Sequence, residues 1–102
     1  MGLLSRKSES TPQAKVTKEL IIVNRLGLHA RPSAMFVKTA SRFKAEIWVE
    51  KDGERVNGKS IMGLMMLAAG QGSRLLLTCE GHDCDKALAE IEEIIRRKFD
   101  ED

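Results

Sequence analysis

The stretch that decides the fold is residues 45–57, AEIWVEKDGERVN, in the middle of the chain. Over residues 45–50, aliphatic Ala45, Ile47 and Val49 alternate with Glu46, Trp48 and Glu50, and a period of two is typical of a half-buried strand. Asp52-Gly53 follows and predicts a hairpin turn, because glycine accepts a positive φ without penalty. A short return strand over 55–57 completes the hairpin, so the fold requires at least one antiparallel strand pair.

Two more strands are expected on either side of this hairpin. Residues 19–24, ELIIVN, contain a β-branched run, and residues 74–80, RLLLTCE, contain three consecutive leucines. Residues 1–18 are rich in Ser, Thr and Lys and lack apolar periodicity. We therefore expect a flexible leader over 1–18 and a single folded domain over 19–102.

Three helices are expected between and after the strands. The first covers residues 31–42, with Pro32 in its first turn, where the missing N–H costs nothing. The second is short, covers 61–67 and has Ser60 as its N-cap, and the third is capped by Asp83. The residues expected on their buried faces are Ala34, Met35, Phe36, Val37 and Ala40 in the first helix, Leu64 and Leu67 in the second, and Leu88, Ile91 and Ile95 in the third.

The resulting order is β-α-β-β-α-β-α, which predicts an α+β fold with one sheet covered on one face by helices. The chain has 102 residues, of which 42% are hydrophobic, enough for one modest core. The net charge is only +2, and the positive charge is concentrated in the leader, which argues against nucleic-acid binding. No apolar run is long enough for membrane insertion.

The two cysteines, Cys79 and Cys84, are too few for a disulfide scaffold, so we expect a cytoplasmic location. The stretch 79–84, CEGHDC, offers several metal-ligand types but lacks a C-x-x-C pair. We therefore interpret both cysteines as free thiols and expect no metal.

The segment most informative about chemistry is residues 27–32, GLHARP. It places His29 just before a helix start, where partial positive charge and free N–H groups favour a bound anion such as phosphate. The same positive end favours neutral imidazole, the form with a lone pair for nucleophilic attack. Arg31 can pair with phosphate oxygens. The residues alone leave two interpretations open, an ordinary surface-loop histidine beside a capping Arg and Pro and a histidine that accepts a phosphoryl group.

Two segments resemble motifs of one known family. Residues 24–32, NRLGLHARP, resemble the active-site signature of HPr, the histidine-containing phosphocarrier of the bacterial phosphotransferase system. Residues 57–65, NGKSIMGLM, resemble a second motif of that family at the expected distance. The resemblance covers about residues 19–98 and implies an open-faced sandwich, with a four-stranded antiparallel sheet and three helices on one side.

The resemblance also implies an activity. Nδ1 of His29 takes a phosphoryl group from Enzyme I, which phosphoenolpyruvate has charged, and passes it to a IIA-type protein. Arg31 and the backbone amides of Ala30 and Arg31 stabilise the phosphate. This is a covalent relay, a transferase component rather than a free-standing enzyme, and it implies no metal, no bound cofactor and a monomer.

Ser60 has two compatible interpretations, as the helix N-cap and as the residue that HPr kinase/phosphorylase modifies in some bacteria. The resemblance also implies that a surface beside the active-site helix docks partner proteins. Methionine suits such a surface because it is flexible and polarizable. The expected docking residues are Ala34, Ile61, Met62 and Met65, with Met62 and Met65 facing outward.

The branch of the family stays open at this point. The context of His29 and the ending 99–102, FDED, resemble the nitrogen-related branch, whereas residues 60–63, SIMG, resemble the kinase-regulated branch. A further alternative is a regulatory module that keeps the fold and only binds partner proteins. The presence of His29 favours transfer over that alternative.

Overall fold

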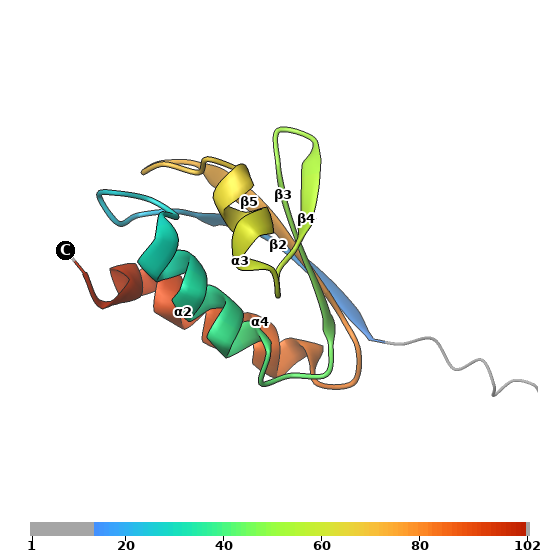
Figure 1. Cartoon of the computed structure of the whole chain (residues 1–102). Coiled ribbons are helices and arrows are strands. Elements are labelled where there is room, and N and C mark those ends of the chain that lie inside the picture. Colours follow the sequence, from blue (N-terminus) through green and yellow to red (C-terminus); the bar gives the residue numbers. More distant parts are fainter. Residues whose placement is uncertain (1–13, 102) are drawn as a thin grey trace, which may run out of the picture.

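Four strands, β2 (Lys15–Ile21), β3 (Glu46–Lys51), β4 (Glu54–Asn57) and β5 (Arg74–Glu80), form one sheet. The structure, a computed structural model, describes residues 14–101. The strand order is β2-β5-β3-β4, and every neighbouring pair is antiparallel (Figure 1). Strands β2 and β3, which are consecutive in the sequence, are therefore separated in the sheet by β5, the last of the four strands in the sequence.

The predicted hairpin is confirmed. Asp52 and Gly53 both have positive φ, 51° and 85°, which is the backbone conformation of the tight turns that match strand twist. Val49 pairs with Val56 across the two strands, and Lys51 and Glu54 form the last pair before the turn.

The first strand begins earlier than predicted, at Lys15 instead of Glu19. Lys15 pairs with Glu80 and Lys18 with Leu77, although most of these side chains are exposed. Backbone hydrogen bonds to β5 define this part of the strand, in which Val16 is the one apolar residue before Leu20, and the sequence prediction missed it. The strand also ends earlier, at Ile21. The rest of the predicted leader, residues 1–13, lies outside the described residues.

Three helices cover one face of the sheet, as predicted for this α+β fold (Figure 1). They are α2 (Ala30–Ala40), α3 (Ile61–Met66) and α4 (Cys84–Arg96), and a short turn, η1 (Lys98–Asp100), follows α4. Figure 1 shows α2 and α4 side by side, with α3 near the β3–β4 hairpin. In the described part of the chain, no helix has the length and hydropathy that crossing a bilayer requires.

The core lies between the sheet and the helices. In β5, Leu75, Leu77 and Cys79 are buried, whereas Leu76 is exposed on the open face. Ile91 and Ile95 of α4 are buried as predicted, and Leu88 is partly buried against them. The buried side chains of the strands and of the helices thus pack against each other in one layer. The helix ends lie outside this layer, where a functional site can form.

The buried face of α2 differs from the prediction. Phe36 and Ala40 are fully buried, but Ala34 is exposed and Val37 is only partly buried. Two polar residues, Ser33 and Thr39, take their places in the buried face. Ser33 can be buried because its hydroxyl donates a hydrogen bond to the carbonyl of Leu28, 3.1 Å away. A pattern that counts only apolar residues misses such satisfied polar positions.

Asp83 stands at the N-cap position of α4, but its side chain makes no capping hydrogen bond. Its two carboxylate oxygens instead accept hydrogen bonds from the backbone N–H groups of Lys44 and Ala45, each at 2.9 Å. The predicted capping role is therefore wrong. The carboxylate thereby joins the start of α4 to the residues just before β3.

Candidate functional site

His29 lies at the N-cap position of α2, as the sequence predicts. Its backbone is extended, and its side chain makes no capping hydrogen bond. The helix start instead uses the His29 carbonyl, which accepts the N–H of Ser33 at 3.0 Å. The imidazole is therefore free of the helix backbone, and 39% of its side-chain surface is exposed.

A tight turn at Gly27 comes just before His29 and positions it. Gly27 has φ +72°, and a Cβ there would lie 2.3 Å from the Ala69 carbonyl oxygen. The next residue, Leu28, is buried and donates its N–H to the same carbonyl at 2.8 Å. Only glycine fits this close approach, so the α3–β5 connection fixes where α2 begins.

Two backbone amides stand at the start of α2 beside His29. In the part of the chain that the structure describes, the N–H groups of Ala30 and Arg31 donate to no carbonyl or side chain. Pro32, the third helical residue, has no N–H and is buried. The helix start thus presents two donors and the positive end of the helix dipole to an anion.

Glu101 is a site residue that the sequence analysis missed. Nε2 of His29 lies 3.2 Å from each carboxylate oxygen of Glu101, and only 16% of the Glu101 side chain is exposed. The hydrogen bond from His29 is the main cause that lowers the pKa of Glu101. A hydrogen bond from Asn24 and the charge of Arg31 lower this pKa further, whereas burial opposes them. No local pattern near the chain end signals this contact.

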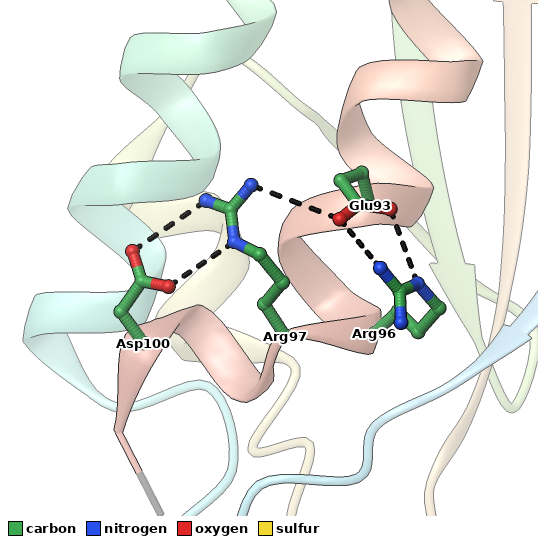
Figure 2. Close-up of polar contacts among 4 residues, drawn as sticks. All are labelled: Glu93, Arg96, Arg97 and Asp100. Carbon is green, nitrogen blue, oxygen red and sulfur yellow. Dashed lines mark hydrogen bonds and ion pairs between the residues drawn. The ribbon is translucent and has the colours of Figure 1, made fainter.

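The turn that brings Glu101 to His29 is unusual in its backbone. Lys98, Phe99 and Asp100 all have positive φ, between 54° and 59°, although none is a glycine. Two contacts hold the turn. The Phe99 side chain is fully buried, and Arg97 donates from Nε to Asp100 at 3.1 Å (Figure 2). Because left-handed backbone is unfavourable for L-residues, the turn depends on contacts of this kind, one local and one with the core.

Ser60 is the N-cap of α3, as predicted. Its Oγ accepts the N–H of Gly63 at 3.0 Å, and its residue is half-buried. The preceding turn is held by Asn57, whose side-chain oxygen accepts the N–H of Lys59 at 2.8 Å. A serine hydroxyl in this position satisfies one of the free amides at the helix start.

An apolar patch covers the outer face of α3. Met62 and Met66 are the most exposed of its side chains, at 74% and 65%, and Ile61 and Met65 are also exposed. The predicted outward orientation of Met62 and Met65 is confirmed, and Met66 joins them. A shallow depression extends from this patch to the histidine, lined by Leu26, Leu28, His29, Met65, Ala68, Ala69 and Gly70. Met65 thus connects the patch with His29, whereas the predicted docking residue Ala34 is exposed on α2.

The two cysteines are buried free thiols, as expected. Burial raises the pKa of the Cys79 thiol to about 11, and the neighbouring Cys84 adds to the rise. The Cys79 thiol therefore stays protonated at neutral pH. Among residues 14–101, no three His, Cys, Asp or Glu side chains are grouped so that they could hold a metal ion.

Comparison with known proteins places this site in a family. Residues 16–97 match the family model described as the PTS HPr component phosphorylation site. The phosphocarrier protein HPr of Neisseria meningitidis is 52% identical over 80 residues, covering 78% of this chain and 90% of the relative. The HPr-like protein Crh of Halalkalibacterium halodurans is 47% identical over 83 residues, covering 81% and 99%.

A solved structure agrees with these matches. HPr from Thermoanaerobacter tengcongensis superimposes with a TM-score of 0.80 at 48% identity, and the match covers 87% of this chain and 98% of that one. The open-faced sandwich, the histidine at the helix start and the sequence matches all agree. This chain therefore belongs to the HPr family of phosphocarrier proteins of the phosphotransferase system.

Proposed function

We propose that this protein relays a phosphoryl group from Enzyme I, charged by phosphoenolpyruvate, through His29 to a IIA-type protein in the cytoplasm. The observation that carries the proposal is the position of His29. Its imidazole caps nothing, is partly exposed and stands beside two backbone amides that donate to no described residue. A nucleophile and an anion site thus share one helix start.

The chemistry needs little beyond positioning. The lone pair of Nδ1 attacks phosphorus, and the bond from phosphorus to the donor breaks in line with the attack. The amides of Ala30 and Arg31 and the guanidinium of Arg31 then face the negative phosphoryl oxygens. In the second transfer, the same geometry works in reverse, with Nδ1 as the leaving group.

The direct experiment is incubation of the full chain with phosphoenolpyruvate and Enzyme I. We expect an adduct that is labile in acid and stable in base, as a phosphohistidine is. His29→Ala should fold normally and acquire no phosphate. The chain contains one other histidine, the exposed His82, so His82→Ala is the matched control and should be labelled like the wild type. Labelling of His29→Ala would overturn the proposal.

The apolar patch on α3 supports a docking role for the surface next to His29. Methionine side chains adapt to several partners, and the depression that includes Met65 and His29 joins the patch to the reacting ring. We propose that Ala34, Ile61, Met62 and Met65 contact Enzyme I and the IIA-type protein. Met62→Glu should raise the concentration needed for half-maximal transfer. Leu76→Glu, on the open face of the sheet, is the control.

A second function, regulation through Ser60, is favoured by its place at the edge of this patch. Modification by HPr kinase/phosphorylase would add negative charge beside Met62 and thereby weaken docking. Incubation with that kinase and ATP should label the wild type and spare Ser60→Ala. Ser41→Ala, at the exposed end of α2, is the control. Measuring transfer to IIA-type proteins of the sugar and nitrogen branches distinguishes the two branches. The monomeric state stays a prediction.

A further inference from the structure

One contact at the site has no part in the relay as proposed above. Glu101 lies 72 residues from His29 in the sequence, yet both of its carboxylate oxygens are 3.2 Å from Nε2 of the ring. An ionised carboxylate only accepts hydrogen bonds. Nε2 must therefore carry the proton of this contact. A neutral imidazole has one N–H and one lone pair, so the lone pair is then on Nδ1.

We infer that Glu101 is a positioning residue that orients the His29 ring and selects the tautomer in which Nδ1 is the nucleophile. This inference rests on the proposed phosphoryl relay and adds a residue to its site. In the proposed relay Arg31 pairs with phosphate oxygens, whereas Glu101 acts on Nε2 of the ring.

The carboxylate is itself held in place. Asn24 is fully buried and donates from Nδ2 to Oε1 of Glu101 at 3.0 Å and to the carbonyl of Gly27 at 2.8 Å. Both partners are acceptors, so the amide nitrogen must face them, and the orientation of Asn24 is determined. On the other side, the buried Phe99 anchors the turn that carries Glu101. Because Asn24 and the Phe99 turn hold the Glu101 carboxylate in place, this carboxylate can in turn orient the His29 imidazole.

Figure 2 shows how the end of α4 supports this turn. The guanidinium of Arg97 lies between Glu93 and Asp100, donating to Asp100 and pairing with Glu93 at 4.0 Å. Glu93 in turn accepts from Arg96. The turn that carries Glu101 is thereby tied to the end of α4.

The same contact has a role during transfer. When Nδ1 forms its bond to phosphorus, the donor keeps the electron pair of the bond that breaks, and the proton stays on Nε2. The ring then carries a positive charge. The Glu101 carboxylate faces that charge directly and stabilises it, as the carboxylate of a catalytic dyad does for an imidazolium.

Nitrogen-15 NMR of the full chain tests the inference before any phosphate is added. Spectra that correlate ring protons with Nδ1 and Nε2 report the tautomer directly, at a pH where titration shows the ring neutral. We expect only the Nε2–H form in the wild type. Glu101→Gln and Glu101→Ala should both populate the Nδ1–H form. Glu54→Gln, an equal change of charge at the β3–β4 hairpin, should not.

The rate of phosphorylation by Enzyme I supplies the second measurement. We expect both Glu101 variants to accept phosphate about tenfold more slowly, as is typical when the partner of a functional histidine is removed. An unchanged tautomer in both variants overturns the inference, even if the rate falls. An unchanged rate with a shifted tautomer also overturns it. If the wild type itself accepts no phosphate, the relay fails, while the tautomer measurement still decides the role of Glu101.

Discussion

Oδ1 of Asp83 accepts the backbone N–H of Ala45 at 2.9 Å, joining the β5–α4 loop to the start of β3. The other carboxylate oxygen accepts the N–H of Lys44. These loops meet at one end of the sheet, opposite the hairpin turn. Asp83→Asn should lower the melting temperature, because an amide can accept only one of the two hydrogen bonds with its oxygen. Thermal unfolding at neutral pH measures this change.

The same contact predicts how stability depends on pH. Hydrogen bonds from Lys44 first, and then from Ala45, lower the pKa of Asp83 below its usual 3.8. A group whose folded pKa is lowered stabilises the fold above its unfolded pKa, and this contribution is lost as the pH falls through the folded pKa. Urea unfolding from pH 5 downward should therefore show a shallower loss of stability in Asp83→Asn than in the wild type. Parallel curves would contradict this role.

Gly27 should tolerate no side chain. Gly27→Ala meets both a positive φ and the Ala69 carbonyl oxygen, whereas Gly72→Ala meets only a positive φ, with open space around it. We expect Gly72→Ala to cost about 1–2 kcal/mol of unfolding free energy, and Gly27→Ala roughly 1–3 kcal/mol more. Urea unfolding of the two variants measures the difference. Equal losses would show that the turn moves away from Ala69 at little cost.

Arg31→Ala should fold like the wild type and accept phosphate roughly 10- to 150-fold more slowly, since a charged hydrogen-bond partner contributes on the order of 1.5–3 kcal/mol. The nucleophile and the backbone amides stay in place. Arg55→Ala removes the same charge from the open face of the sheet, where Arg55 stacks on Trp48 at 4.8 Å. That control should transfer normally. Equal rates for Arg31→Ala and the wild type would mean that the amides suffice.

Ser60→Ala should lose about 1 kcal/mol of unfolding free energy, because the Gly63 amide loses its partner. Ser60→Asp should retain or slightly raise stability, since a carboxylate caps a helix start equally well. Its charge next to Met62 should nevertheless weaken docking, because a partner must desolvate it. Transfer rates measured against carrier concentration should show a lower apparent affinity for Enzyme I. An unchanged affinity, or a collapsed melting temperature, would refute this explanation.

Local sequence was sufficient wherever a few neighbouring residues decide the backbone. Asp52-Gly53 predicts the hairpin because its conformational preference is intrinsic to two residues. Ser60 predicts the start of α3 for a similar reason, since its hydroxyl reaches an amide only three positions away. The placement of His29 at a helix start followed from Pro32 and the adjacent motif. In each case the interaction spans less than two helical turns.

The tertiary structure alone decided the contacts between distant segments. β2 begins at Lys15 because β5 supplies backbone partners there, and a single apolar residue in 15–18, Val16, is too little to predict that pairing. Asp83 binds Ala45 rather than its own helix because the sheet brings the two loops together. Glu101 reaches His29 only because burial of Phe99 holds three residues in left-handed backbone. Such contacts depend on how distant segments of the chain pack together. The pattern of neighbouring residues in the sequence does not contain that information.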